Sequence, residues 1–572
     1  MLQVSVLKEQ TDRVLAGLAK KHYPTGPADV AAILDLDQRR RALQTTHDAA
    51  QAEANDLARQ IGALMKTGDQ AGADALKLRT AALKQHTKTA TDELTQVEIA
   101  IQQLLYKLPN LPHASVPEGR AAADNELVRA HGAKPALYAG AQPHWELIKK
   151  YDIIDFELGI KITGAGFPVY KGQGARLQRA LVNFFLDEAR AAGYTEVQPP
   201  IVVNEASATA TGQLPDKEGQ MYHDAKDDLY LIPTAEVPVT NLYRDEIIPV
   251  EQLPIRNTAY TPCFRREAGS WGADVRGLNR LHQFDKVEIV QITQPENSYA
   301  ALDGMVAHIE SLLQKLGLPY RVLRLCGGDM GFASALTYDL EVWSAAQGRW
   351  LEVSSASNFE TYQANRLKCR YRADGGKTQL LHTLNGSALA LPRIVAALLE
   401  NNQTADGIEL PAVLHSYCGF KRIESKGNIE STRPKKQRDY TQYLFKGVTY
   451  GKGKLVNAVV SGYVNQHPAI TIGKLFEIFP ASIQGRWGVF TLREQAESIH
   501  SDITKNGKPA RKRYLMNSDK LIKVESLQIV TSDQWNPENI YAFIKAARKI
   551  GFEIESISED ATTTSGTEDW LF

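Results

Sequence analysis

The sequence predicts an α+β protein with three successive parts: a long helical hairpin, an antiparallel sheet with flanking helices, and a small additional α/β domain. Residues 29 to 108 are nearly free of proline and carry apolar residues at helical spacing. Residues 115 to 424 mix strand-like and helical patterns without a regular βαβ repeat. A polar, charged stretch then precedes a further folded segment, and 572 residues are enough for several domains.

The N-terminal part, residues 1 to 114, is predicted to be dominated by two antiparallel helices. Their apolar positions include Leu57, Ile61, Leu94 and Val97, and small polar residues with two glycines interrupt the pattern at residues 66 to 74. Arms of about 35 residues would reach roughly 50 Å, farther than a compact core needs. The pattern alone fits an oligomerising coiled coil or a lever that contacts a large partner.

The central part, residues 115 to 424, is predicted to form an antiparallel sheet with helices. Strand-like runs occupy residues 196–203, 229–233, 286–292, 320–326 and 339–343, and residues 174–193 have an amphipathic helical pattern. The segment contains neither GxGxxG nor GxxxxGK[ST], which argues against a Rossmann or P-loop nucleotide site.

The four cysteines favour a reducing compartment. Cys263, Cys326, Cys369 and Cys418 lie far apart and form no CxxC pair, so neither a disulfide framework nor a cysteine-based zinc site is indicated. The chain begins without a signal-peptide pattern and has no apolar run long enough to span a bilayer. We therefore expect a cytoplasmic protein without a membrane partner.

The C-terminal part is predicted to comprise a linker at residues 425–439, a domain at residues 440–560 and a mobile tail at residues 561–572. Residues 421 to 560 hold 23 Lys or Arg and 15 Asp or Glu, whereas the whole chain is neutral. Helical patterns at residues 453–468 and 471–479, a strand-like WGVF, the RKR at residues 511–513 and exposed-looking Trp487 and Trp535 permit a winged-helix-like nucleic-acid binder. They equally permit a structural or protein-interaction domain.

The densest polar stretch is TAYTPCFRREAGSWGADVRGLNRLHQFDKVEIV, residues 258 to 290. It reads as two antiparallel strands joined by a glycine-rich loop. Strand alternation would then place Arg265 and Glu267 on one face, and Phe284, Lys286 and Glu288 together on one face. From composition alone, such a face could also be a set of surface ion pairs.

This stretch resembles motif 2 of the bacterial-type seryl-tRNA synthetases, a family of class II aminoacyl-tRNA synthetases. GYTEVQPPIVVN at residues 193–204 resembles motif 1, at the family's dimer interface, and LIPTAEVPVTN at residues 231–241 resembles its amino-acid loop. EVSSASN at residues 352–358 resembles an ATP and serine strand, and HTLNGSALALPRIVAALLENNQ at residues 382–403 resembles motif 3. The resemblance covers residues 1 to about 424, including the hairpin, and gives the C-terminal domain no function.

The resemblance implies an enzyme that activates L-serine with ATP and Mg²⁺ and then transfers it to the 3′ end of serine tRNA, working as a homodimer. The residues implied as catalytic are Arg265, Glu267 and Arg393. Those implied for serine are Thr234, Ala235, Glu236, Arg265, Glu288, Asn385 and Ser387. Those implied for ATP are Arg265, Arg266, Glu267, Phe284, Glu352, Val353, Ser354, Ser355 and Arg393, with Glu352 and Ser355 for the metal.

These residue types suit the reaction. A carboxylate attacking the α-phosphate of ATP brings two anions together, so fixed cations and in-line positioning are needed. The resemblance assigns Arg265 to the serine carboxylate and α-phosphate, Arg393 to the γ-phosphate and Phe284 to adenine. Ser387 has a second reading, as the N-cap of the motif 3 helix.

The chain departs from the family pattern at Ala273, Gly327, Ala356 and Asn365, and these departures remove none of the groups named above. Relatives that charge a carrier protein lack the hairpin. A catalytically impaired RNA-binding or regulatory relative would be expected to lose Arg265, Glu267 or Arg393, and all three are present.

The family's hairpin reaches across the dimer to the long variable arm of serine tRNA, which it recognises by shape and phosphate contacts. In this sequence, the candidate phosphate contacts are Arg39, Arg40, Arg41, Lys77, Arg79 and Lys84.

Overall fold

The computed structural model describes residues 1–216, 219–267, 276–373, 375–424, 441–485, 487–504 and 513–557. Chain contacts divide the protein into two compact units, Met1–Gly427 and Asn428–Phe572. Among the described residues, no helix combines the length and the apolar character needed to cross a membrane.

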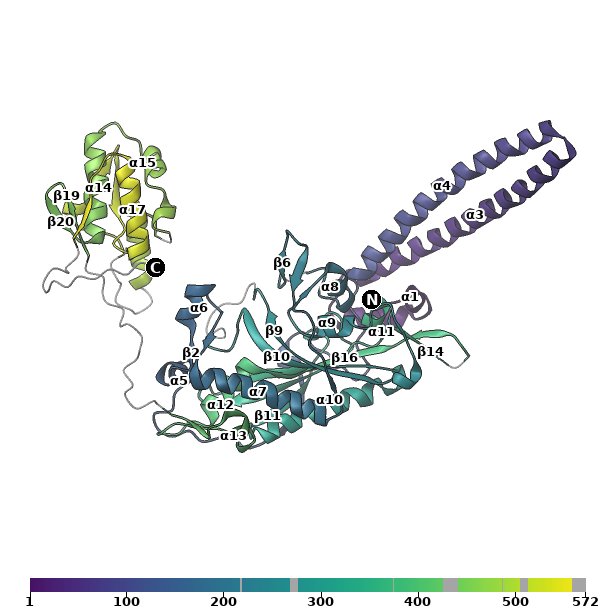
Figure 1. Cartoon of the computed structure of the whole chain (residues 1–572), viewed down its shortest axis with the longest axis horizontal. Coiled ribbons are helices and arrows are strands. Elements are labelled where there is room, and N and C mark those ends of the chain that lie inside the picture. Colours follow the sequence, from purple (N-terminus) through teal and green to yellow (C-terminus); the bar gives the residue numbers. More distant parts are fainter. Residues whose placement is uncertain are drawn as a thin grey trace, which may run out of the picture. The chain divides into compact units, whose positions relative to one another are not determined.

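The N-terminal helices confirm the predicted hairpin. Short helices α1 (Val4–Glu9) and α2 (Thr11–Lys20) precede the long antiparallel pair α3 (Gly26–Thr67) and α4 (Gln70–Lys107) (Figure 1). The predicted interruption at residues 66–74 is too long. Only Gly68, in the left-handed region, and Asp69 separate the helices, because the Asp69 side chain accepts a hydrogen bond from the Gly72 amide and so caps α4.

The hairpin is anchored at its root and mostly covers itself farther out. Val30 and Ile33 of α3 pack with Val97 and Ile101 of α4 in a cluster that also includes Tyr362 of the central part of the chain. Beyond this root the buried side chains are few, such as Leu57 and Leu94, as expected when two helices contact only each other.

An eight-stranded sheet forms the centre of the larger unit and confirms the predicted antiparallel architecture. Its order is β1-β11-β12-β13-β16-β10-β9-β4, and every neighbouring pair is antiparallel except β4 with β9. The strands are β1 (Glu126–His131), β4 (Thr195–Glu196), β9 (Ile255–Phe264), β10 (Gln283–Thr293), β11 (Tyr320–Arg324), β12 (Leu336–Ser344), β13 (Arg349–Asn358) and β16 (His382–Ala390).

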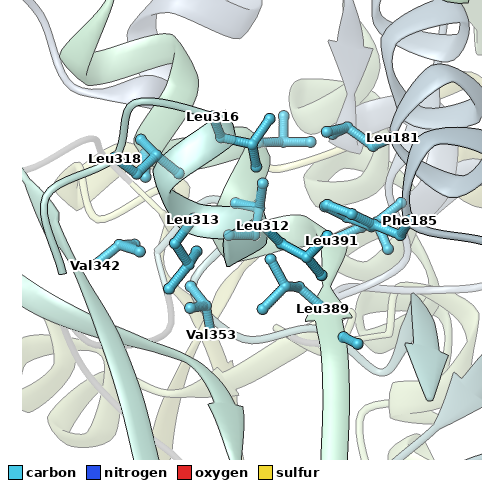
Figure 2. Packing of buried hydrophobic residues seen from close by; sticks show 14 of the residues in the cluster. Leu181, Phe185, Leu312, Leu313, Leu316, Leu318, Val342, Val353, Leu389 and Leu391 are labelled. Carbon is cyan, nitrogen blue, oxygen red and sulfur yellow. The ribbon is translucent and has the colours of Figure 1, made fainter. Parts of the chain in front are cut away.

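Three helices cover one face of this sheet: α7 (Gly172–Ala191), α10 (Ser298–Lys315) and α12 (Leu391–Asn401). Figure 2 shows Leu181 and Phe185 of α7 near Leu312 of α10 and Leu391 at the start of α12, with Val353 and Leu389 from the strands. Because side chains alternate along a strand, residues such as Val287 and Ile289 enter this core, while Lys286 and Glu288 point to the other face.

Shorter elements surround the sheet. The helices are α5 (His144–Lys150), α6 (Phe156–Ile162), α8 (Glu205–Thr211), α9 (Glu236–Asn241), α11 (Thr361–Leu367) and α13 (His415–Cys418). The strands are β2 (Ile154–Asp155), β3 (Val169–Tyr170), β5 (Val202–Val203), β6 (Tyr222–Asp224), β7 (Leu229–Leu231), β8 (Ile247–Ile248), β14 (Arg370–Arg372), β15 (Thr378–Leu380), β17 (Ile408–Glu409) and β18 (Arg422–Ile423). The strand expected at residues 196–203 is wrong as one element: β4 and β5 join different sheets on either side of Pro199 and Pro200, which cannot donate ladder hydrogen bonds.

The described residues of the smaller unit form two three-stranded sheets and four α-helices. The sheets are β20 (Val448–Tyr450), β19 (Gln442–Phe445) and β24 (Glu555–Ile557), and β21 (Phe490–Leu492), β23 (Leu527–Thr531) and β22 (Ile522–Val524). The helices are α14 (Lys452–Gln466), α15 (Ile472–Ile478), α16 (Arg493–Thr504) and α17 (Pro537–Lys549). The helices expected at residues 453–468 and 471–479 correspond to α14 and α15, and the Thr471 side chain caps α15.

The structure differs from two sequence expectations for the smaller unit. Trp487 and Trp535 are half-buried, because Trp535 packs against Phe543 in the core and Trp487 lies under the Arg513 guanidinium. The described residues between 441 and 557 hold eleven Lys or Arg and ten Asp or Glu, so this part of the unit has almost no cationic surplus. Most of the surplus counted in the sequence falls on residues 425–440, 486 and 505–512, outside the described residues, as do Arg511 and the expected tail.

Candidate active site

A cavity of about 680 Å³ lies over the polar face of the central sheet. Strands β10, β13 and β16 supply its floor, and the chain segments that follow β7 and β9 supply its walls. Most of the predicted site residues line it: Thr234, Glu236, Arg265, Glu267, Phe284, Glu352, Val353, Ser354, Ser355, Asn385, Ser387 and Arg393.

A hydrogen-bonded network beside the cavity surrounds two buried carboxylates: Glu236, which lines the cavity at the start of α9, and Glu288 on β10, which lies behind the lining. The Asn385 amide on β16 bridges them, since its Nδ2 donates to Glu236 Oε2 at 2.7 Å and to Glu288 Oε1 at 3.0 Å. Lys286 Nζ lies 2.6 Å from Glu288 Oε2 and donates to Thr234 Oγ1 at 2.8 Å. One cation and one amide therefore hold two carboxylates together away from water.

Burial raises the pKa of Glu236 to about 7, and the neighbouring Glu288 charge acts in the same direction. A hydrogen bond from Gln363 Nε2 to Glu236 Oε1 at 2.6 Å opposes this shift, as do the charges of Lys286 and Arg265. Gln363 is itself fixed, because its Oε1 accepts from Thr383 Oγ1 at 2.7 Å. The cavity thus offers a carboxylate whose charge depends on pH near neutrality and which a cationic ligand would ionise.

The motif 2 segment supplies a cation and an aromatic ring beside this network. Arg265 follows directly on β9, donates from Nε to the Pro233 carbonyl at 3.3 Å, and lies 5.3 Å from the Phe284 ring centre. Glu267 pairs with Arg280 Nε at 2.9 Å. The strand argument for Arg265 and Glu267 was wrong, because β9 ends at Phe264 and Glu267 has a φ of 50°. Both still line the cavity, from the loop instead of the strand.

Arg393, in the first turn of α12, also lines the cavity. Its Nε donates to the Asn279 carbonyl at 3.0 Å, and its Nη1 donates to the Glu352 carbonyl at 2.7 Å. Both partners are backbone oxygens, so they orient the guanidinium without neutralising its charge. Glu352 Oε2, at 3.5 Å, is a weaker contact.

Oxygen donors for a cation gather on β12 and β13. Asp339 Oδ1 is buried and has no hydrogen-bond partner, and burial raises the Asp339 pKa, with the Glu352 charge adding and a Ser355 hydrogen bond opposing. Glu352 and Ser355, the predicted metal residues, therefore share their site with a third oxygen side chain. The part of the chain that the structure describes contains no cluster of three His, Cys, Asp or Glu arranged to hold a metal ion alone. Hard oxygen donors of this kind fit Mg²⁺ that is carried in by phosphates.

Three predicted site residues lie outside the cavity lining. Ala235 is buried in an apolar cluster with Val239, Arg266 is exposed with its amide bound to the Gln220 carbonyl, and Glu288 lies behind Thr234 and Asn385. The N-cap reading of Ser387 is wrong, because Ser387 lies within β16 and Ala390 occupies the cap of α12.

Sequence reasoning gave no role to Lys286, Asp339 or Gln363. The strand alternation had placed Lys286 on the same face as Glu288, which was the available signal for it. Asp339 lies in a segment that was interpreted only as a strand, and Gln363 lies in α11, after the EVSSASN segment. The contacts of both residues depend on packing between elements far apart in sequence.

Three of the residues that depart from the family pattern have close contacts within the larger unit. A Cβ at Gly327 would lie 2.2 Å from the Lys20 carbonyl, Ala356 is buried in the core against Gly386, and Asn365 Nδ2 donates to the Met1 carbonyl at 2.9 Å. These three residues thus serve packing within the unit. Ala273 lies outside the described residues.

The sequence comparisons assign these features to a known family. Residues 1–112 match the family described as "Seryl-tRNA synthetase N-terminal domain", and residues 220–402 match "tRNA synthetase class II core domain (G, H, P, S and T)". A serine--tRNA ligase of Salinibacter ruber is 52% identical over 425 residues, which cover 74% of this chain and 99% of that protein. The chain belongs to the seryl-tRNA synthetase family.

Further seryl-tRNA synthetases match a similar share of the chain. The serine--tRNA ligase of Acidithiobacillus ferrooxidans is 48% identical over 421 residues, which cover 73% of this chain and 98% of that protein. The crystal structure of seryl-tRNA synthetase from Pyrococcus horikoshii complexed with ATP aligns with a TM-score of 0.70 and 32% identity, covering 74% of this chain and 100% of that one. About a quarter of this chain therefore lies outside each of these matches.

The Lys286 contacts generate a prediction about stability. Lys286→Met leaves two buried carboxylates without their nearest cation and should lower the free energy of unfolding by about 3 to 5 kcal/mol at pH 8. The loss should be smaller at pH 5. Because the folded-state pKa of Glu236 lies above its ordinary value, the folded protein takes up protons as the pH falls through 7 and the uncompensated charge decreases.

Urea unfolding at both pH values measures this effect. Lys315→Met is the matched control, because Lys315 is half-exposed in its pair with Glu188, and it should cost less than about 1 kcal/mol. Equal losses for the two variants at pH 8 would show that Lys286 does not compensate the buried carboxylates.

Proposed function

We propose that this cavity activates L-serine with ATP, forming seryl-adenylate and pyrophosphate, and then transfers serine to the 3′ end of serine tRNA. The observation that carries the proposal is that one cavity combines a buried polar pocket with Arg265, Phe284 and Arg393 in its lining. The residue roles below follow from this geometry and from the family's chemistry.

The serine subsite is formed by Thr234, Glu236, Asn385 and Ser387. Glu236 receives the serine ammonium, and that cation draws the carboxyl into its ionised form despite the raised pKa. Glu288 acts from behind by fixing Thr234 and Asn385 through its two oxygens. A pocket built from donors and acceptors discriminates by hydrogen bonds to the substrate hydroxyl, because a substrate without that group leaves buried polar atoms unpaired.

The ATP subsite lies between Arg265 and Arg393. Phe284 stacks on adenine, and Glu267, held by Arg280, accepts a hydrogen bond from the nucleotide. Arg265 bridges the serine carboxylate and the α-phosphate with its planar guanidinium, while Arg393 binds the γ-phosphate. Ser354 donates to the Ser387 carbonyl at 2.6 Å and so joins the nucleotide strand β13 to the serine strand β16.

Asp339, Glu352 and Ser355 are the residues that would hold Mg²⁺ together with the phosphates. The ion supplies positive charge to the phosphate oxygens during nucleotidyl transfer. No general base is required in the first step, because the serine carboxylate is already ionised at neutral pH. The protein's contribution is therefore positioning and fixed positive charge.

The hairpin is the tRNA-binding element of this proposal. Most of its predicted phosphate contacts already have acidic partners: Arg39 pairs with Glu93, Arg40 and Arg41 with Asp37, Lys77 with Asp74, and Arg79 with Glu53. Among the described residues, Lys84 is exposed and has no ion pair. Phosphate binding must compete with these surface pairs, which exchange readily because each contributes little.

Three further assignments complete the proposal. The enzyme acts as a homodimer through the motif 1 region, so that the hairpin of one protomer serves the cavity of its partner, and it works in the cytoplasm. The described part of the smaller unit is nearly neutral, which favours a structural or protein-contact role over a phosphate-binding one. The alternative of an impaired, regulatory relative has less support, because Arg265, Glu267 and Arg393 all line the cavity.

The role of Arg265 is tested by Arg265→Lys, which keeps the charge but removes the planar two-pronged contact. Serine-dependent pyrophosphate exchange should fall by about two to three orders of magnitude. Arg190→Lys is the matched control, because Arg190 lies on α7 in an exposed ion pair with Asp187 outside the cavity lining, and it should change exchange by less than about threefold. A loss below about tenfold for Arg265→Lys in a folded protein would place Arg265 away from the reacting phosphate.

The role of the hairpin is tested by shortening it. Arg39 faces Glu93 and Glu53 faces Arg79, so position 44 faces about position 88, and residues 45–87 can be replaced by a short glycine-rich turn. The root residues Val30, Ile33, Val97 and Ile101 are retained. Serine activation should remain within about twofold, since the removed part packs mainly on itself, while aminoacylation of serine tRNA should fall at least about a hundredfold. A parallel fall in activation would show that the distal hairpin supports the catalytic unit.

A further inference from the structure

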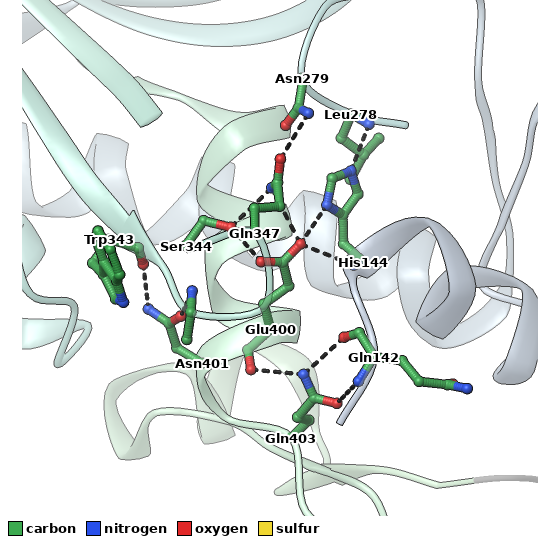
Figure 3. Close-up of polar contacts among 11 residues, drawn as sticks. Gln142, His144, Leu278, Asn279, Trp343, Ser344, Gln347, Glu400, Asn401 and Gln403 are labelled. Atoms are coloured by element: carbon green, nitrogen blue, oxygen red, sulfur yellow. Dashed lines mark hydrogen bonds and ion pairs between the residues drawn. The ribbon is translucent and has the colours of Figure 1, made fainter. Parts of the chain in front are cut away.

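A buried histidine–carboxylate pair lies next to the cavity but outside its lining. His144 opens α5, Glu400 lies near the end of α12, and both side chains are fully buried (Figure 3). The proposed mechanism gives neither residue a role. A buried charge without hydrogen-bond partners is energetically costly. The hydrogen bonds around His144 and Glu400 therefore show which segments of the chain the pair holds in place.

Glu400 is saturated with donors. Its Oε1 accepts from the His144 amide at 2.9 Å, from His144 Nδ1 at 2.7 Å and from Gln347 Nε2 at 3.2 Å, and its Oε2 accepts from Ser344 Oγ. Burial alone would raise the Glu400 pKa, but the hydrogen bonds from His144 and Ser344 outweigh burial and lower it. Glu400 is thus a carboxylate with fixed orientation.

The His144 imidazole connects Glu400 to the motif 2 loop by hydrogen bonds. The Leu278 amide donates to His144 Nε2 at 2.9 Å, so Nε2 carries no proton and the neutral ring carries its proton on Nδ1, facing Glu400. Gly277, with a φ of 66°, approaches the ring so closely that a Cβ would lie 2.3 Å from Nε2. The loop therefore rests directly on the imidazole.

A second connection runs through Gln347. Its Oε1 accepts from Asn279 Nδ2 at 3.0 Å, and its Nε2 reaches Glu400. The segment 278–279 is therefore tied to Glu400 twice, through His144 and through Gln347. The Asn279 carbonyl is the acceptor that orients Arg393 Nε.

We propose that His144 and Glu400 are positioning residues for nucleotide binding: they fix residues 277–279 so that the Asn279 carbonyl orients Arg393 toward the phosphates of ATP. The inference rests on the proposed role of Arg393. It predicts an effect on ATP and not on serine, because the serine subsite is formed by α9, β10 and β16 and shares no hydrogen bond with this network.

The test is pyrophosphate exchange with the full chain, varying ATP and serine separately. His144→Phe keeps an aromatic ring but removes both nitrogens, and it should raise the KM for ATP about tenfold or more, with the KM for serine within about twofold. His144→Gln offers an amide oxygen to the Leu278 amide and an amide nitrogen to Glu400, so it should recover much of the ATP affinity and provides a measurement if His144→Phe does not fold. His308→Gln, a half-buried histidine on α10, is the matched control and should change neither KM.

A double-mutant cycle with Arg393→Ala separates this inference from the proposed function. If Arg393→Ala raises the KM for ATP and His144→Phe adds little in that background, His144 acts through Arg393. If the two effects multiply, or if both KM values rise together, the pair has only a structural role and the inference is wrong. If Arg393→Ala leaves the KM for ATP unchanged, the phosphate role of Arg393 fails and the inference fails with it.

Discussion

The burial of two carboxylates at the base of one cavity is the constraint on which the rest of the site depends. Glu236 and Glu288 can stay close together only because Lys286 and the Asn385 amide lie between or beside them. These groups come from α9, β10 and β16, so the pocket exists only when the sheet has its observed order. In the proposed mechanism the substrate ammonium would complete the compensation of charge, which would couple recognition of an amino acid to the electrostatics of the folded enzyme.

One face of the central sheet packs against the helices, and the other face carries the polar residues of the site. Val287 and Ile289 of β10 pack into the helical layer, whereas their neighbours Lys286 and Glu288 belong to the site. The loop that follows β9 adds Arg265 and Glu267 to the cavity lining. Backbone carbonyls orient the two arginines: Arg265 donates to the Pro233 carbonyl, and Arg393 of α12 donates to the Asn279 and Glu352 carbonyls. Positive charge is thereby oriented without being neutralised.

Much of this architecture could be predicted from the sequence, and the exceptions have physical reasons. Helical periodicity indicated both arms of the hairpin, and strand alternation placed Lys286 beside Glu288. The alternation argument failed at Glu267, because the ladder ends at Phe264 and periodicity says nothing about where a strand stops. Asp339, Gln363 and the His144–Glu400 pair depend on contacts between residues far apart in the chain, which no local pattern encodes.

We propose above all that this cavity selects serine by its hydroxyl and activates it with ATP. Exchange of labelled pyrophosphate into ATP tests it directly when L-serine, L-alanine and glycine are supplied in parallel to the full-length protein. Serine should support exchange, and alanine should be slower by at least about a thousandfold, because it leaves buried polar groups of the pocket unpaired. Comparable exchange with alanine, or none with serine, would contradict the account.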